Sequence, residues 1–269
     1  MGTVAEFPRI AQGRARSRQH LSGPAGTRGV HLGPDDPRLR QVPVFQLGEI
    51  SLDIPPENLG TRVQLALERG SFERDEARAL ARHFTPHDRL LDLGSGTGYM
   101  ACVAGHIAGG KAVTGVEALP DMVEVARANL LRNGIEGARV HWGAVVPESH
   151  GSAHVRFGAR KQFWASAILR EGDSRYRAAL EVPALRLSNL LRETGATVLS
   201  CDIEGGELAL FEIDLPDQLR LVIIEIHPKV YGDAGVAQVL DGLRRNDMVY
   251  CAKGSAGTTL VFRRIGTEA

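Results

Sequence analysis

Apolar runs in the middle of the chain alternate with amphipathic segments. Residues 89–95 (RLLDLGS), 111–118 (KAVTGVEA) and 219–227 (LRLVIIEIH) are short and nearly continuous in apolar residues, as expected for strands buried on both faces. Residues 120–134 begin with Pro and end with Asn-Gly, which is typical of a helix. This alternation predicts an α/β fold with a mostly parallel sheet, helices on both of its faces and an antiparallel last strand.

The remaining segments extend this pattern toward both ends of the chain. Residues 42–55 alternate partly around Leu-Gly-Glu and predict a hairpin. Residues 248–265 contain a Gly-rich turn and predict a terminal hairpin. In chain order, the other expected elements are helices at 61–69, 72–84 and 98–110, a strand at 138–146, a helix at 184–195, a strand at 197–203, a short helix from about Gly206 and a helix at 235–247.

Composition divides the chain into three parts. Residues 1–40 hold seven Arg against three acidic residues, are rich in Gly and Pro, and predict a basic N-terminal extension. Residues 41–85 comprise the hairpin and two helices, and residues 86–266 the alternating domain. Within that domain, residues 150–181 break the rhythm and predict an inserted hairpin or loop. Four residues of this insert are candidates for an acceptor site: Arg156, Lys161, Trp164 and Arg170. Residues of this kind more often lie on a hairpin that faces solvent.

The composition of the whole chain narrows the classes of partner. Lys plus Arg and Asp plus Glu balance at 32 each, so no net charge draws the chain to nucleic acid. No apolar run approaches the roughly 18 residues of a membrane span, and the N-terminus lacks the apolar core of a secretory signal. Three scattered Cys indicate neither a disulfide framework nor a metal knuckle. We therefore expect a cytoplasmic protein without a membrane partner, and the composition leaves the oligomeric state open.

The stretch DLGSGTG joins a predicted strand to a predicted helix. Gly94, Gly96 and Gly98 permit a tight turn and let backbone N–H groups approach a ligand closely. A dinucleotide fingerprint would require glycine at the position of Tyr99. Asp92 at the strand end would repel a pyrophosphate but suits a ligand that carries an ammonium group. These features favour a positively charged nucleoside ligand, S-adenosylmethionine.

Glu117 ends the next predicted strand, about 20 residues past the loop, where a carboxylate accepts hydrogen bonds from both ribose hydroxyls. Taken singly, these residues would be turn glycines or surface acids. Their combination of strand, glycine loop, helix, strand and Glu favours a cofactor site. The candidate cofactor-binding residues here are Asp92, Gly94, Ser95, Gly96, Gly98, Glu117, Ala118, Trp142, Gly143 and Asp202. Trp142 either stacks on adenine or packs in the core.

Several motifs occur together in this chain: SFERDEARALARHF, LDLGSGTGYM, VEALPDMVEVARANLLRNG and, most specifically, DIEGGE followed by IIEIHP. Over about residues 72–264 the sequence thereby resembles the FkbM family of class I methyltransferases. The resemblance implies a Rossmann-like sheet of seven strands, S-adenosylmethionine as the cofactor, and contact of Glu73 with its methionine end. A solvated helix face is an equally good interpretation of Glu73. The family usually has Lys at the position of Ser200, so the role of that ammonium group is either performed differently here or absent.

Acidic residues follow two strands that this topology makes neighbours. Strand periodicity places Asp202 and Glu204 on one face of the first, and Glu225 and His227 on one face of the second. The group admits three roles: a general base for an acceptor hydroxyl, a site for a divalent metal ion, or an electrostatic partner of a sulfonium. Glu207 is interpreted mainly as a cap of the following helix, and Glu225 as a partner of an Arg or Lys.

The sequence as a whole predicts an S-adenosylmethionine-dependent methyltransferase. Its acceptor is expected to be an oxygen of a small or sugar-like molecule, with Asp202, Glu204 and His227 as the catalytic residues. Three alternatives remain at this point: a nucleic-acid or protein methyltransferase of the same fold, a non-catalytic cofactor-binding accessory protein, and an NAD-dependent reductase. Neutral net charge and the lack of an Asn/Asp-Pro-Pro-Tyr motif disfavour a nucleic-acid acceptor.

Overall fold

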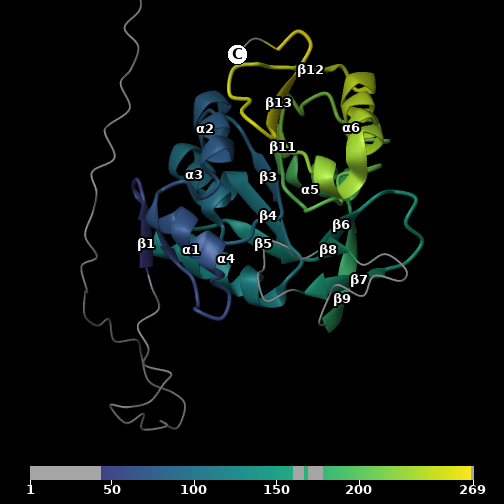
Figure 1. The fold of residues 1–269 in the computed structure, drawn as a ribbon. Coiled ribbons are helices and arrows are strands. Elements are labelled where there is room, and N and C mark those ends of the chain that lie inside the picture. Colours follow the sequence, from purple (N-terminus) through teal and green to yellow (C-terminus); the bar gives the residue numbers. More distant parts are fainter. Residues whose placement is uncertain (1–43, 160–166, 169–177, 268–269) are drawn as a thin grey trace, which may run out of the picture.

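The computed structural model describes residues 44–159, 167–168 and 178–267. The strands of its main sheet are β3 (Leu90–Leu93), β4 (Val113–Glu117), β5 (Arg139–Trp142), β10 (Val198–Cys201), β11 (Leu221–Glu225), β12 (Met248–Tyr250) and β13 (Thr259–Arg264). Within the described residues these seven strands lie in the order β12-β13-β11-β10-β3-β4-β5 (Figure 1). The strands from β11 to β5 pair in parallel, whereas β13 is antiparallel to both neighbours. The predicted Rossmann-like fold class is confirmed.

Helices cover both faces of this sheet. They are α1 (Thr61–Glu68), α2 (Arg74–His83), α3 (Tyr99–Ala108), α4 (Pro120–Arg132), α5 (Leu187–Thr194) and α6 (Pro228–Arg245). Leu90 of β3 lies in a core that includes residues of α2, α3 and α4. Leu91 and Leu93 lie in a second core with residues of α5 and α6. Successive strand residues therefore pack against opposite helical layers, which is why β3 is apolar on both sides.

The predicted N-terminal hairpin is confirmed as β1 (Val44–Leu47) and β2 (Ile50–Asp53). Asn129 of α4 holds it in place, because its side-chain oxygen accepts the Asp53 backbone N–H at 2.8 Å. The amide nitrogen of Asn129 also donates to the backbone carbonyl of Thr97 at 3.0 Å. One buried amide thereby fixes the hairpin and the glycine-rich loop to the same helix.

A second sheet lies beside the main one and corrects one predicted element. It comprises β6 (Ala144–Val146), β7 (His154–Ala159), β8 (Ala167–Ile168) and β9 (Ala178–Arg186), in the order β6-β9-β7-β8. The predicted strand at 138–146 is wrong because the chain divides at Gly143 into β5 and β6. A Cβ at Gly143 would lie 2.5 Å from the Leu185 side chain, so the close crossing of β9 requires glycine. The antiparallel pair β7–β9 confirms the hairpin predicted in the insert.

Three helix predictions differ from the structure. The helix predicted at 184–195 begins only at Leu187, because β9 extends to Arg186. The short helix predicted from Gly206 is wrong, because this segment forms turns. The helix predicted at 235–247 begins earlier, at Pro228, and bends where Gly232 has a φ of 65°.

The predicted extension at residues 1–40 lies outside the described residues, and the division of the chain into domains stays a prediction. Among the helices that the described residues form, none is both long and apolar enough to cross a membrane.

A buried ion pair joins the amino ends of β3, β10 and β11. Asp88, which is 4% exposed, accepts hydrogen bonds from Arg220 Nε at 2.8 Å and from the Thr197 hydroxyl at 2.7 Å. The backbone N–H of Thr85 donates to the other carboxylate oxygen at 2.8 Å. Burial favours the neutral carboxyl, but the hydrogen bonds from Arg220, Thr197 and Thr85 outweigh it and lower the pKa of Asp88 to about 2. This network sets the relative positions of the three strands that carry the site described below.

Replacing Asp88 by Asn is expected to lower the free energy of unfolding by about 2–3 kcal/mol, because hydrogen bonds to a charged group are lost. The folded-state pKa lies below the ordinary 3.8, so the carboxylate stabilises the fold above about pH 4 and ceases to do so as the pH falls toward 2. Urea unfolding at pH 7 and pH 3 measures both effects. The control Asp241→Asn breaks an exposed pair with Arg244 and should cost less than about 1 kcal/mol; equal losses would contradict this account.

Candidate functional site

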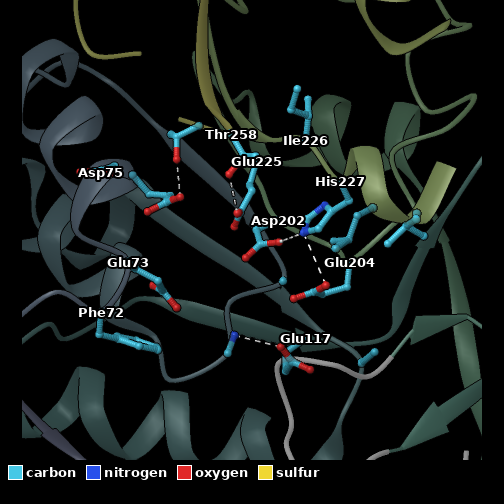
Figure 2. Close-up of a pocket in the computed structure, with 18 of the residues that line it drawn as sticks. Phe72, Glu73, Asp75, Glu117, Asp202, Glu204, Glu225, Ile226, His227 and Thr258 are labelled. Carbon is cyan, nitrogen blue, oxygen red and sulfur yellow. Dashed lines mark hydrogen bonds and ion pairs between the residues drawn. The ribbon is translucent and has the colours of Figure 1, made fainter. Parts of the chain in front are cut away.

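A cavity of about 860 Å³ opens where the carboxyl ends of β3, β4, β10 and β11 meet (Figure 2). Open α/β sheets bind their ligands at this edge, and the volume is typical of a small-molecule site. We call it the strand-end cavity. The predicted site residues that line it are Glu73, Gly94, Gly96, Glu117, Ala118, Gly143, Asp202, Glu204 and His227. Those that lie outside its lining are Asp92, Ser95, Gly98 and Trp142.

The glycine-rich loop packs directly on the end of β10. Gly94 has a φ of 83°, and a Cβ there would lie 1.8 Å from the backbone oxygen of Asp202. The backbone N–H groups of Gly94 and Ser95 both donate to the carbonyl of Val116, at 2.9 and 3.0 Å. Gly98 has a φ of 79° and precedes α3, so the loop ends at a helix N-terminus. Glycine at these positions lets the loop backbone form one wall of the cavity.

Glu117 lies at the end of β4 with both oxygens bonded to backbone. Its Oε2 accepts the Gly96 N–H at 2.9 Å, and its Oε1 accepts the Leu119 N–H at 2.8 Å. Burial raises the pKa of Glu117, although these N–H groups act in the opposite direction. The carboxylate is thus rigid, 8% exposed and still part of the cavity lining. A rigid acceptor of this kind suits the two hydroxyls of a ribose.

The chain on either side of Trp142's hydrogen bond, at Ala118 and Gly143, lines the side of the cavity next to β4, whereas Trp142 itself does not. The indole N–H of Trp142 donates to the carbonyl of Ala118 at 3.0 Å, and 43% of the residue is exposed. Ala118 and Gly143 themselves line the cavity. Stacking of Trp142 on adenine therefore stays a prediction, whereas the small residues leave room for a flat ring.

Asp92 lies behind the glycine-rich loop and is 2% exposed. Burial raises its pKa to about 6, while hydrogen bonds from the hydroxyls of Ser95 and Ser200 act to lower it. Ser200 is the residue of β10 that pairs with Asp92. Ser200 therefore stands beside this carboxyl, where the resembled family usually has an ammonium group. Among the described residues, Asp92 Oδ2 is buried without a hydrogen-bond partner. Binding of a cofactor by Asp92 stays a prediction.

Four ionisable side chains meet at the ends of β10 and β11, and we call them the His227 cluster: Asp202, Glu204, Glu207 and His227. His227 Nε2 lies 3.5 Å from Asp202 Oδ1 and 3.4 Å from Glu204 Oε2. Its Nδ1 lies 3.3 Å from Glu207 Oε1. Figure 2 shows the side chains of Asp202, Glu204 and His227 pointing toward one another. The expected convergence of these three residues is confirmed, because β10 and β11 are parallel neighbours.

Glu207 is the residue of this cluster that the sequence interpretation misplaced. It is wholly buried, and its Oε1 accepts the backbone N–H of Ile203 at 3.2 Å. The predicted role as a helix cap is wrong, because this segment forms turns, in which Glu204 has a φ of 52°. The signal available in the sequence was the group of three acids in DIEGGE, which the turn brings to the two ring nitrogens of the imidazole.

Glu225 lies beside the cluster without joining it. Its Oε1 accepts the hydroxyl of Thr258 at 2.9 Å, as Figure 2 also shows. The expected partner of Glu225 was an Arg or Lys; the hydrogen bond that we observe comes from a neutral hydroxyl. Glu225 therefore adds negative charge to the cavity.

The acids and the imidazole of the cluster shift one another's pKa values. Burial raises the pKa of Asp202, and Glu225 and Glu204 raise it further. Burial raises the pKa of Glu204 to about 7, although His227 acts to lower it. For His227, burial would lower the pKa, but the contact with Glu207 and the charge of Asp202 raise it to about 9. The cluster thus retains protons because its carboxylates are close together and partly shielded from water.

Glu73 enters the cavity from a different element. It precedes α2 with a φ of 44°, and Figure 2 shows it beside Phe72, on the side of the cavity opposite His227. Burial raises the pKa of Glu73, and the neighbouring Glu76 and Asp92 raise it further. Its contact with a cofactor stays a prediction, but its position within the lining favours a ligand role over a solvated helix face.

The second sheet supplies an apolar side of the cavity. Phe157 of β7 and Ile168 of β8 both line it, and sequence reasoning did not select them. Arg156, which it did select, is exposed and lies outside the lining. The other candidates of the insert, Lys161, Trp164 and Arg170, lie outside the described residues.

Comparison with known proteins assigns a family to most of the chain. A model described as "Methyltransferase FkbM domain" matches residues 92–250. The chain is 48% identical over 84 residues to the ribosomal protein L11 methyltransferase of Thermus thermophilus, a match that covers 28% of this chain and 32% of that protein. It is 44% identical over 54 residues to the protein-L-isoaspartate O-methyltransferase of Methanoculleus marisnigri, covering 20% and 24%. The chain thus spans about a third or less of the length of these curated relatives.

Two solved structures are similar at low sequence identity. Fibrillarin of Aeropyrum pernix, in complex with natively bound S-adenosyl-L-methionine, is 12% identical with a TM-score of 0.41 and covers 70% of this chain and 74% of its own. An O-methyltransferase from Bacillus cereus in complex with SAH is 11% identical with a TM-score of 0.38 and covers 78% and 84%. At these scores neither structure bears on the acceptor or the mechanism of this chain.

The packing of the glycine-rich loop on β10 can be tested with a pair of alanine variants. Gly94→Ala adds a Cβ at 1.8 Å from a backbone oxygen, whereas Gly48→Ala, also at positive φ, adds one with no atom within 4 Å. Gly48→Ala should cost only the backbone strain, about 1–2 kcal/mol. Gly94→Ala should cost about 1–3 kcal/mol more, because the loop must move off Asp202. Urea unfolding measures both, and equal losses would contradict the close approach of loop and strand.

Proposed function

Because the chain belongs to the family of FkbM methyltransferase domains, we propose that it is an S-adenosylmethionine-dependent methyltransferase that methylates an oxygen of a small-molecule or sugar-like acceptor. The observation that carries the proposal is the arrangement of one cavity. Glu117 lies beside the glycine-rich loop, and Asp202, Glu204 and His227 lie at the neighbouring strand ends of the same cavity.

The residues present suit the parts of this cofactor. Glu117 accepts the ribose hydroxyls, and the loop at Gly94 and Gly96 lets backbone approach the ligand. Ala118 and Gly143 leave space for the adenine beside β4. When bound, S-adenosylmethionine supplies a methyl group on a positively charged sulfur, together with an ammonium group.

Charge supports a cationic cofactor over a dinucleotide. Among the described residues, seven carboxylates line the cavity, against three Arg and Lys side chains. The carboxylates are Glu73, Asp75, Glu76, Glu117, Asp202, Glu204 and Glu225, and the cations are Arg62, Arg74 and Lys229. Opposite charges within about 4–6 Å stabilise the ionised form of such groups, whereas a pyrophosphate would add like charge. The same argument disfavours the NAD-dependent reductase considered from the sequence.

The catalytic residues are proposed to be Asp202, Glu204 and His227. They hold the acceptor hydroxyl near the ends of β10 and β11 and remove its proton as the methyl group is transferred. Alignment of the reacting atoms can contribute about 7–11 kcal/mol to lowering a barrier of this kind. Removal of the proton by a placed group adds roughly 10²- to 10⁴-fold in rate.

A protein acceptor is the second candidate. The observation that favours it is the local identity to a methyltransferase named for ribosomal protein L11. A cytoplasmic setting, which the sequence predicts, is compatible with either acceptor.

Labelled methyl transfer separates these functions. The purified chain would be incubated with S-adenosylmethionine labelled in its methyl group and with separate panels of hydroxylated small molecules, sugars and ribosomal proteins. We expect label in a small or sugar-like acceptor. Label only in protein would favour the second candidate. Binding of S-adenosylhomocysteine without any transfer would indicate an accessory protein, and calorimetric preference for NAD would contradict the proposal.

Glu117→Ala is expected to weaken binding of S-adenosylhomocysteine about 30- to 100-fold, because hydrogen bonds to a charged group contribute about 1.5–3 kcal/mol. Isothermal titration calorimetry measures the dissociation constant. Glu124→Ala serves as the control, since it removes an exposed acid that pairs with Arg127 on α4. If Glu117→Ala bound the ligand as tightly as this control, the ribose assignment would be wrong.

Asp202→Asn is expected to leave the affinity for S-adenosylhomocysteine within about threefold, because this product carries no sulfonium charge. Its turnover with an acceptor identified above should fall by about 10²- to 10⁴-fold. Calorimetry gives the first quantity and single-turnover methyl transfer the second. Full activity of this variant would remove Asp202 from the catalytic residues.

A further inference from the structure

Three side chains of the His227 cluster have the donor atoms and spacing of a metal site. One ligand atom each from Asp202, Glu204 and His227 can be chosen such that all lie within 4.8 Å of one another. The Nε2 of His227 is 3.4–3.5 Å from the nearest carboxylate oxygens. Ligands about 2.1–2.4 Å from one ion, at right angles, would themselves be about 3.0–3.4 Å apart. The distances from the imidazole to the two carboxylates are therefore within a few tenths of an ångström of those expected for ligands of one ion.

A second observation is the wholly buried carboxylate behind the imidazole. Glu207 Oε1 lies 3.3 Å from His227 Nδ1, and Glu207 Oε2 is buried without a hydrogen-bond partner among the described residues. The backbone N–H of His227 is fixed separately, because it donates to the Tyr231 hydroxyl at 2.6 Å. The Glu207 carboxylate thus lies on the Nδ1 side of the ring, where Nδ1 itself has no hydrogen-bond partner among the described residues, and Nε2 faces the two acids. Histidines that bind metals are oriented by a carboxylate in this way.

A third observation concerns the carboxylate of Asp202, which lies beside Nε2 of His227. Asp202 Oδ1, the atom nearest His227 Nε2, is buried and has no hydrogen-bond donor among the described residues. Glu204 Oε2 approaches the same ring nitrogen at 3.4 Å. A buried carboxylate oxygen without a donor beside a second acid is a position that a cation can occupy.

We propose that Asp202, Glu204 and His227 bind a divalent cation, and that this ion holds the acceptor hydroxyl for methylation. The inference rests on the proposed function and deepens it. Two carboxylates and one imidazole suit Mg²⁺ or Mn²⁺, which prefer six ligands. Three ligand positions then remain for the acceptor and water, so an acceptor with a hydroxyl next to a second oxygen is favoured.

The chemical step balances without a redox partner. An ion held by Asp202, Glu204 and His227 would lower the pKa of the acceptor hydroxyl, and the oxygen of Glu204 that does not face the ion would accept the hydroxyl proton. The acceptor oxygen forms a bond to the methyl carbon while the carbon–sulfur bond breaks, and the electron pair of that bond returns to sulfur. The products are the methyl ether, S-adenosylhomocysteine and one proton, which is released to water.

The test uses Mn²⁺ alone as the probe, with the full chain and no acceptor. Electron paramagnetic resonance of free Mn²⁺ during titration gives the dissociation constant and stoichiometry. We expect one site per chain, weakened at least tenfold by Glu204→Gln and by Asp202→Asn. Glu225→Gln removes the same charge from the cavity without removing a ligand and should change the affinity by less than about fivefold. Glu207→Gln should weaken binding about 10- to 100-fold through the orientation of His227.

The outcomes separate this inference from the proposed function. No saturable Mn²⁺ binding by the folded chain, or equal loss in Glu225→Gln and Glu204→Gln, would overturn the metal site. Circular dichroism of each variant shows whether a loss reflects unfolding. The partly buried ligand Glu204 provides the readout, through Glu204→Gln, if Glu207→Gln does not fold. Methyl transfer should be lost in EDTA and restored by Mg²⁺ or Mn²⁺. Transfer that is unaffected by EDTA would contradict the metal site and leave the proposed function intact. Lack of S-adenosylhomocysteine binding would contradict the proposed function itself.

Discussion

The site depends on the parallel, in-register pairing of β3, β10 and β11. Ser200 of β10 pairs with Asp92 on one side and with Ile223 on the other, so all three strands end at one edge of the sheet. The buried contact of Asp88 with Arg220 fixes the opposite ends of the same strands. Because the strands are short and rigid, residues far apart in the chain meet at the cavity within hydrogen-bonding distance. A shift of one residue in this pairing would turn the acids away from one another.

The second constraint is electrostatic. Carboxylates gather around the strand-end cavity, and fully buried acids are rare in proteins unless something compensates them. Glu117 is compensated by backbone N–H groups, whereas Oδ2 of Asp92 is buried without a hydrogen-bond donor among the described residues. Asp202 and Glu204 depend on His227 and on whatever cation enters the cavity. A cationic methyl donor and a divalent ion would both supply positive charge to offset these carboxylates. In the proposed account, the donor binds beside the glycine-rich loop and the ion binds at the His227 cluster.

The sequence predicted the elements that follow from hydrophobic period and from glycine. The strand before the DLGSGTG loop, the helix after it and the convergence of Asp202, Glu204 and His227 all follow from the local sequence pattern and the topology of a parallel sheet. The role of Glu207 could not be predicted, because it depends on a left-handed turn at Glu204 that local propensity does not favour. The division of one apolar run at Gly143 likewise depends on a tertiary contact with Leu185. The place of Glu207 and the end of the strand at Gly143 therefore depend on how distant parts of the chain pack.

The central claim is that one cavity holds the methyl donor against Glu117 and directs its reactive end toward the His227 cluster. A crystal structure of the chain with S-adenosylhomocysteine and Mn²⁺ tests it most directly. The account predicts ribose hydroxyls on Glu117, adenine beside Ala118 and Gly143, and the sulfur facing an ion bound by Asp202, Glu204 and His227. A nucleoside bound elsewhere, or a sulfur directed away from this cluster, would contradict it.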